Sequence, residues 1–237
     1  MRTFLAIKSC NRHADRRTAQ RSTWLPDLEI PFHFFVGLPA HIPNSRLRHR
    51  RPQPPARPLD ADVVQLAVDD SFKNIAPKIR GIAEYALQNN FTRVVIVDDD
   101  VFLVPARLAR FINANHADVL AYLRPDYPQG SCCVYNVGAL EVLATSDELK
   151  DGVPDDVAVG RALAGMAWTH TELFQPGPVP RLILPSNDFI TAHKCLPVAT
   201  HQTQHSMYSI NAMWKNHNSD FGKENENASH QHKLQNT

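Results

Sequence analysis

Residues 94–102 read Val-Val-Ile-Val-Asp-Asp-Asp-Val-Phe, an apolar run that leads directly into three consecutive carboxylates. Because Val94–Val97 does not alternate with polar residues, it predicts a strand buried on both faces. Three adjacent Asp at the end of such a strand repel one another and are costly to remove from water, so we expect a compensating partner. Mg²⁺ or Mn²⁺ is the obvious candidate, since both prefer oxygen ligands. The alternative is an acidic turn with one Asp as a helix N-cap.

The composition is that of an ordinary globular protein. The chain has 237 residues, 43% of them apolar, and a net charge of +1, which gives no general attraction to nucleic acid or to an anionic membrane. The four cysteines form no Cys-x-x-Cys motif, and we expect reduced, partly buried thiols. The N-terminal apolar run is too short for a secretory signal, and no run approaches the roughly 18 residues of a membrane span. These features predict a cytoplasmic protein.

Strand and helix patterns alternate through the first 120 or so residues, which predicts an α/β fold with a mostly parallel central sheet flanked by helices. We expect strands at 4–7, 31–37, 62–66, 94–97, 118–123 and 132–137, with late candidates at 181–184 and 196–200. We expect helices after Arg12, from Asp70-Ser71 to Asn89, and at 105–113, 139–146 and 154–164. Residues 1–221 are expected to form a single domain, and the polar residues 222–237 a disordered tail.

Three groups of residues are candidates for chemistry. They are the Asp98–Asp100 cluster, the Asp155-Asp156 pair at a predicted helix start, and His201 or His205 after a late strand. One or two carboxylates, an imidazole and diphosphate oxygens could together hold a divalent cation. A separate carboxylate could then act as general base on a hydroxyl, which suits group transfer from a nucleotide diphosphate. Helix capping is the alternative role for Asp155 and Asp156.

Basic residues occur in two segments upstream. Arg17 and Arg21 are four residues apart, so a helix would place them on one face, and arginine forks suit pyrophosphate. A solvated basic face is the alternative. The Pro-rich segment Arg46–Pro58 predicts a long exposed loop, and RNA or phosphate binding is a lesser possibility for it.

Four blocks of the chain resemble the β-1,3-glycosyltransferases, which include galactosyltransferases, N-acetylglucosaminyltransferases and Fringe. They occur in family order, and any one alone is weak. The blocks are Arg16-Arg17-Thr18-Ala19-Gln20-Arg21-Ser22-Thr23-Trp24, Asp70-Ser71-Phe72-Lys73-Asn74-Ile75-Ala76-Pro77-Lys78, Val97-Asp98-Asp99-Asp100-Val101-Phe102 and Pro154-Asp155-Asp156-Val157-Ala158-Val159-Gly160.

The resemblance implies a GT-A-type nucleotide-sugar transferase fold and an inverting transfer from a UDP-sugar donor to a glycan or other hydroxyl acceptor. Because most animal members of the family are anchored in the Golgi, it also implies the Golgi lumen as the compartment if a native anchor is missing. It implies that Asp156 is the catalytic base and that Asp98, Asp100 and His201 hold Mn²⁺ or Mg²⁺, with His205 as the alternate to His201. The donor-binding residues that it implies are Arg17, Arg21, Asp70, Lys78, Asp98 and Asp99.

The chain departs from the family pattern at Ser131–Tyr135, where the family often has a Gly-rich run near the acceptor site. This departure leaves the acceptor and the β-1,3 linkage open. A non-catalytic module that binds glycans, or RNA through the Arg46–Arg57 segment, is the alternative from a different class. A nucleotidyl- or phosphotransferase is disfavoured because the chain lacks a Walker-type Gly-Lys-Ser/Thr loop.

Overall fold

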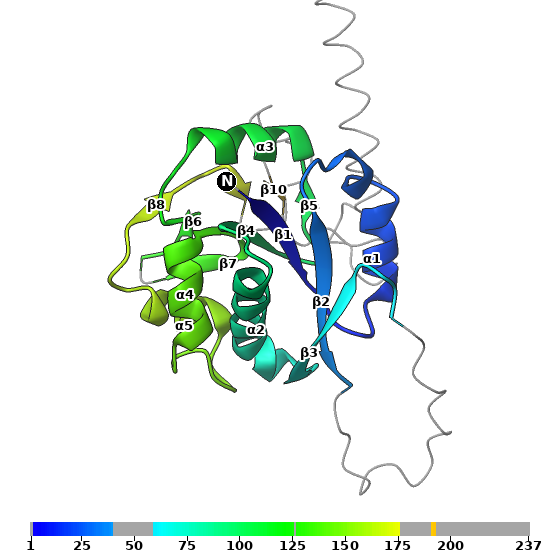
Figure 1. Ribbon diagram of the computed structural model, residues 1–237, viewed down its shortest axis with the longest axis horizontal. Helices are drawn as coiled ribbons and strands as arrows, with labels where there is room; N and C mark the ends of the chain where they lie inside the picture. The colour runs from blue at the N-terminus through cyan, green and yellow to red at the C-terminus, as the bar shows by residue number, and fades with distance from the viewer. Residues whose placement is uncertain (1, 40–58, 126, 176–190, 193–237) are drawn as a thin grey trace, which may run out of the picture.

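The computed structural model describes residues 2–39, 59–125, 127–175 and 191–192, which build a three-layer α/β arrangement (Figure 1). Within this part of the chain a seven-stranded sheet has the order β3-β2-β1-β4-β7-β6-β8. Its strands are β1 (Thr3–Lys8), β2 (Phe32–Leu38), β3 (Val63–Asp69), β4 (Arg93–Asp98), β6 (Val119–Leu123), β7 (Pro128–Asn136) and β8 (Trp168–His170). The short strands β5 (Phe102–Leu103), β9 (Phe174–Gln175) and β10 (Thr191–Ala192) form a second sheet.

The sheet is mostly parallel, as predicted. Strands β3, β2, β1 and β4 are paired in parallel, and so are β6 and β8. Strand β7 lies antiparallel between β4 and β6, with Val97 opposite Cys132. The carboxyl ends of β1 and β4 therefore meet the beginning of β7 at one edge of the sheet.

Strands β1 and β4 are buried on both faces, which confirms the prediction made from their unbroken apolar runs. Phe4, Ala6, Val94 and Ile96 belong to the core on one face of the sheet. Their neighbours in sequence belong to the core on the other face, namely Leu5, Ile7, Val95 and Val97.

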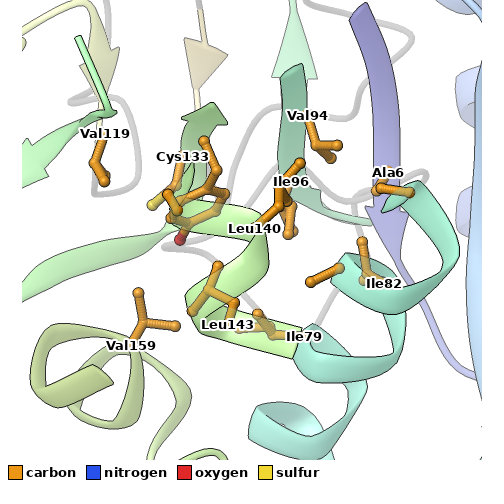
Figure 2. Packing of buried hydrophobic residues seen from close by; sticks show 14 of the residues in the cluster. Ala6, Ile79, Ile82, Val94, Ile96, Val119, Cys133, Leu140, Leu143 and Val159 are labelled. Carbon is orange, nitrogen blue, oxygen red and sulfur yellow. The ribbon is translucent and has the colours of Figure 1, made fainter. Parts of the chain in front are cut away.

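Helices cover both faces. On one face α2 (Ile75–Gln88), α4 (Val137–Thr145) and α5 (Asp155–Ala162) lie side by side (Figure 1), and Figure 2 shows their apolar side chains packed against those of β1, β4, β6 and β7. On the other face lie α1 (Ala14–Arg21), the 3₁₀ turn η1 (Leu25–Asp27) and α3 (Pro105–Ala114). The predicted helices are thus all present, and their apolar faces are buried in these two cores.

Two local predictions are corrected. Asp70 and Ser71 do not cap a helix; a 3₁₀ turn, η3 (Phe72–Asn74), follows them, and α2 begins only at Ile75. The Asp70 carboxylate instead accepts hydrogen bonds from other segments, as described below. Strand β7 begins at Pro128 and not at Cys132, because Pro128 pairs with Leu123 of β6. Proline is tolerated as the first residue of a strand, where its missing N–H does little harm.

Several predictions fall on residues that the structure does not describe. These are the segment Arg46–Pro58, the candidate strands at 181–184 and 196–200, His201, His205 and the tail 222–237. Cys10, Cys132 and Cys133 are free thiols, as expected. Among the described residues, no helix is both long enough and apolar enough to cross a membrane.

Gly37 allows the close approach of β2 to the end of β3. A Cβ atom at this position would lie 2.5 Å from the carbonyl oxygen of Val68 and 2.8 Å from the backbone of Asp70. We expect Gly37→Ala to destabilise the protein by about 1–3 kcal/mol, the usual cost of overpacking. Urea unfolding followed by circular dichroism measures this loss. Gly165→Ala is the matched control, because a Cβ there meets nothing within 4 Å, and equal stability of the two variants would contradict the prediction.

Candidate active site

A cavity of about 360 Å³ lies at the edge of the sheet where β1 and β4 end. It is lined by residues of five segments, which are 8–16, 70–78, 98–100, 129–131 and 155–156. The structure thus brings together the Asp98–Asp100 cluster, the Asp155-Asp156 pair and the segment that contains Asp70 and Lys78. This is the edge at which open α/β sheets bind ligands.

The three consecutive Asp have different environments. Asp98 ends β4, and its Oδ1 lies 3.0 Å from Nζ of Lys8. Asp99 and Asp100 form a tight turn, in which the N–H of Val101 donates to the carbonyl of Asp98. Asp100 lies 3.5 Å from the guanidinium of Arg16. The turn leads to strand β5 and not to a helix, so none of the three Asp caps a helix here.

Asp99 anchors α1 and the loop before it to the end of β4. Its carboxylate, which is only 3% exposed, accepts from Ser9 Oγ at 2.8 Å and from Arg16 at 2.7 Å, and it lies 2.9 Å from Nδ1 of His13. Burial opposes ionisation of Asp99, but His13, Arg16 and Ser9 together lower its pKa below the ordinary value. The middle carboxylate therefore already has its charge compensated within the protein.

Lys8 connects the Asp cluster to α5. Its buried ammonium donates to Asp155 Oδ2 at 2.8 Å and to the carbonyl of Gly130 at 3.0 Å, and it also pairs with Asp98. Burial opposes the charge of Lys8, but Asp155 and Asp98 outweigh it and raise the pKa of Lys8 well above its ordinary value. Lys8 is thus a charged bridge between β1, β4, β7 and the first turn of α5.

The two carboxylates at the start of α5, Asp155 and Asp156, have pKa values shifted in opposite directions. Burial opposes ionisation of Asp155, but Lys8 lowers its pKa below the ordinary value. For Asp156, burial and the neighbouring Asp155 raise the pKa, while a hydrogen bond from the N–H of Val157 at 2.9 Å acts in the opposite direction. Both residues line the cavity, but Asp155 is fixed in an ion pair with Lys8, whereas Asp156 is the weaker acid.

Asp70 and Lys78 line the cavity as an ion pair. Asp70 Oδ1 accepts from Lys78 Nζ and from the N–H of Gly37, both at 3.0 Å, and Oδ2 accepts from the backbone and side chain of Asn11. Lys78 also donates to the carbonyl of Ser9. These contacts fix the loop after β1 against the start of α2.

Arg17 and Arg21 do not line the cavity among the described residues, and they do not act as a pair. The buried guanidinium of Arg17 donates to Ser9 Oγ and to the carbonyl of Cys10. Arg21 makes a bidentate contact with Asp62 at 2.6 and 2.8 Å and lies over the ring of Phe34. Both side chains support the loop and the strands around the site.

The donor set at the cavity suits a hard divalent cation. Asp98 and Asp100 present carboxylate oxygens there, and Mg²⁺ and Mn²⁺ sites commonly use one or two carboxylates together with substrate phosphates. Among the described residues, no group of three or more His, Cys, Asp or Glu side chains could hold a metal ion. The third predicted ligand, His201, and its alternate His205 lie outside those residues.

Sequence reasoning missed Lys8, Ser9 and His13. The sequence did contain a signal for Lys8, which is a charged residue directly after the apolar run Phe4–Ile7. The three Asp follow the apolar run Val94–Val97 in the same way. Parallel neighbouring strands bring such positions together at one edge. No comparable signal marks Ser9 or His13, which contact Asp99 only because α1 folds back over the end of β4.

Comparison with protein families gives a match to galactosyltransferase over residues 15–134, about half of the chain. Comparison with curated proteins gives no significant match. Among solved structures, a mannosyltransferase from Pyrobaculum calidifontis in complex with GDP-mannose and Mn²⁺ is similar at 14% identity over 72% of this chain and 54% of that chain, with a TM-score of 0.45. HddC from Yersinia pseudotuberculosis is similar at 7% identity over 71% and 89%, with a TM-score of 0.43. Both TM-scores are below 0.5, so the family assignment depends on the sequence match.

Replacing Lys8 tests its role as the charged bridge. Lys8→Met keeps the length of the side chain but leaves Asp98 and Asp155 without their shared cation. We expect a loss of about 3–5 kcal/mol in the free energy of unfolding, because removing one partner leaves buried charge uncompensated. Urea unfolding measures the loss, and Lys150→Met, at an exposed lysine, is the control. A Lys8→Met variant as stable as the control would show that Lys8 is not a bridge.

Proposed function

The chain belongs to the galactosyltransferase family, and we propose that it is an inverting glycosyltransferase that moves a sugar from a UDP-sugar to an acceptor hydroxyl. The predicted GT-A-type fold agrees with this membership and with the mostly parallel sheet. The family match ends at residue 134, before the fourth resembling block at 154–160. The proposal for the catalytic base is therefore supported by the geometry of the site.

The observation that carries the proposal is the difference in contacts between Asp155 and Asp156. Asp155 is paired with Lys8, whereas Asp156 forms no ion pair within the described residues and lines the same cavity as Asp98 and Asp100. A general base must reach its substrate and must have a pKa high enough to accept a proton. Both residues line the cavity, but only Asp156 has a raised pKa and no ion pair within the described residues, so it meets the second condition better than Asp155 does.

In the proposed reaction the Asp156 carboxylate takes the proton of the acceptor hydroxyl. The hydroxyl oxygen forms a bond to the anomeric carbon while the bond from that carbon to the UDP oxygen breaks, and the electron pair leaves with UDP. Attack from the face opposite the leaving group inverts the anomeric centre. Lys8 keeps the first turn of α5 against β4 and β7 during this step, and so fixes the base relative to the donor.

We propose that Asp98 and Asp100 hold the divalent cation, with His201 or His205 as a further ligand. A bound Mn²⁺ or Mg²⁺ would supply positive charge that stabilises the departing diphosphate. Arg12 also lines the cavity and makes no ion pair with any described residue, so its guanidinium is available to the diphosphate. In this proposal Arg12 contacts the donor directly, while Arg17 and Arg21 act through the segments that they support.

The metal assignment is tested by binding UDP. We expect UDP to bind the wild-type protein in the presence of Mn²⁺. When EDTA removes the metal, the affinity for UDP should fall by roughly tenfold or more, because the positive charge that favours the diphosphate is lost. Asp100→Ala should show a similar loss, because it removes one of the carboxylates. Isothermal titration calorimetry measures both effects.

Asp151→Ala removes an exposed carboxylate outside the cavity and is the control for this measurement. If the wild-type protein binds no UDP with Mn²⁺ present, the proposed donor and metal are wrong. If Asp100→Ala binds UDP as well as the control does, Asp100 is not a ligand.

The base assignment is tested by Asp156→Asn, which keeps the shape of the side chain. We expect unchanged UDP affinity and a loss of transfer of roughly 10²–10⁴-fold, the usual contribution of a general base. The raised pKa of Asp156 places the acid limb of the rate profile at a higher pH than an ordinary Asp would give, because the base works only when deprotonated. UDP release, measured as a function of pH across a panel of UDP-sugars and glycoside acceptors, reports both effects. Unchanged turnover in Asp156→Asn would remove this residue as the base.

A further inference from the structure

Phe72 presents an aromatic ring to solvent at the cavity. Its side chain is 83% exposed, whereas the other exposed large apolar side chains of the described residues, Leu38, Leu59 and Val137, are 40–42% exposed. Folding buries most large apolar side chains, so the ring of Phe72 contributes little to the core. Phe72 lines the same cavity as Asp156 and the Asp98–Asp100 cluster. Because the ring lies at the cavity and is exposed, a ligand in the cavity can contact it.

The segment that carries Phe72 is fixed on both sides. Before it, Asp70 accepts hydrogen bonds from Asn11, Gly37 and Lys78. After it, the carbonyl of Lys73 accepts from the N–H of Gly152 at 2.9 Å. Gly152 belongs to the loop that leads into α5. The segment that carries the ring is therefore hydrogen-bonded to the loop that precedes Asp156, the proposed base.

The neighbourhood of Phe72 combines an apolar surface with polar groups. Ile75, half-buried at the start of α2, lines the cavity together with Phe72, and Gln129 and Asp156 line it from β7 and α5. The Oε1 atom of Gln129 accepts from Arg124 at 3.1 Å, which fixes the amide. Ligand sites commonly pair an apolar surface with a few oriented polar groups. A pyranose ring matches such a site, since its C–H groups form an apolar face and its hydroxyls a polar rim.

We propose that Phe72 is the stacking platform for a pyranose ring of the acceptor. This inference rests on the proposed transferase function and on Asp156 as the base, because the acceptor hydroxyl must lie at that carboxylate. The diphosphate of the donor is assigned to the Asp98–Asp100 side, where Arg12 and Arg16 also lie. The segment of Phe72 is hydrogen-bonded through Lys73 to Gly152, in the loop before α5. Its ring is therefore assigned to the acceptor sugar, whose hydroxyl attacks the donor.

Saturation-transfer NMR tests the platform with two defined probes, methyl β-D-galactopyranoside and methyl N-acetyl-β-D-glucosaminide, in the presence of UDP and Mn²⁺. The proteins are the wild type, Phe72→Ala, Phe72→Trp and the control Val137→Ala, which removes another exposed apolar side chain outside the cavity. We expect at least one glycoside to bind the wild type, the control and Phe72→Trp. We expect Phe72→Ala to weaken that binding by roughly three- to tenfold, the size of an aromatic stacking contribution. The affinity for UDP, measured by calorimetry, should stay the same in all four proteins.

The outcomes separate this inference from the proposed function. Equal glycoside binding by Phe72→Ala and the wild type would overturn the platform, and so would the absence of glycoside binding by a wild-type protein that binds UDP. A loss of UDP affinity in Phe72→Ala would mean that the ring contacts the nucleobase, which also overturns the inference. If the wild type binds no UDP with Mn²⁺, the proposed donor fails, while glycoside binding that depends on Phe72 would still support the platform.

Discussion

The ion pairs of Lys8 are the interaction on which the site depends. One buried ammonium lies between Asp98 at the end of β4 and Asp155 at the start of α5, and it also donates to the carbonyl of Gly130 at the start of β7. A Cβ at Gly130 would lie 3.0 Å from Asp155 Oδ2, so a larger residue here would require this carboxylate to shift by a few tenths of an ångström. The contacts therefore join the parallel half of the sheet, the antiparallel strand β7 and the helix that carries the proposed base. Without this cation the two carboxylates would be close together and uncompensated.

Neighbouring acidic residues of the site have different partners. In the Asp cluster, Asp99 is directed to α1, while Asp98 and Asp100 line the cavity together with their basic partners Lys8 and Arg16. In the pair on α5, Asp155 is directed to Lys8 and Asp156 is not. In each group one acidic side chain connects segments of the fold, and a neighbour is the residue proposed to take part in binding or catalysis.

Much of the fold could be predicted from the sequence, because β1 and β4 are unbroken apolar runs and the helices show apolar faces at helical spacing. The start of β7 could not be predicted, since Pro128 and Gly130 are typical of loops, and the pairing of Pro128 with Leu123 of β6 arises only in the tertiary structure. At the site, the acidic clusters were identifiable from their position after a strand or at a helix start. Ser9 and His13 were not identifiable, because they are distant in sequence from the carboxylate that they contact. Only Lys8 carried a signal, since it directly follows the buried run of β1. The spacing of Arg17 and Arg21 indicated a shared face, but each guanidinium is directed to a different segment.

The internal pairing of Asp99 has a consequence for the order in which ligands assemble. Because Ser9, His13 and Arg16 compensate this carboxylate, and Lys8 shares the charge of Asp98, residues of the protein itself already neutralise most of the acidic charge of the cleft. A divalent cation arriving alone would meet only a modest attraction, and so would a diphosphate arriving alone. The two together form a nearly neutral ligand, since the charge of one cancels much of the charge of the other. If the donor binds with a metal as proposed, the cleft would favour the metal–nucleotide complex over either component alone, while the ion pairs of Lys8 and Asp99 hold the surrounding segments together.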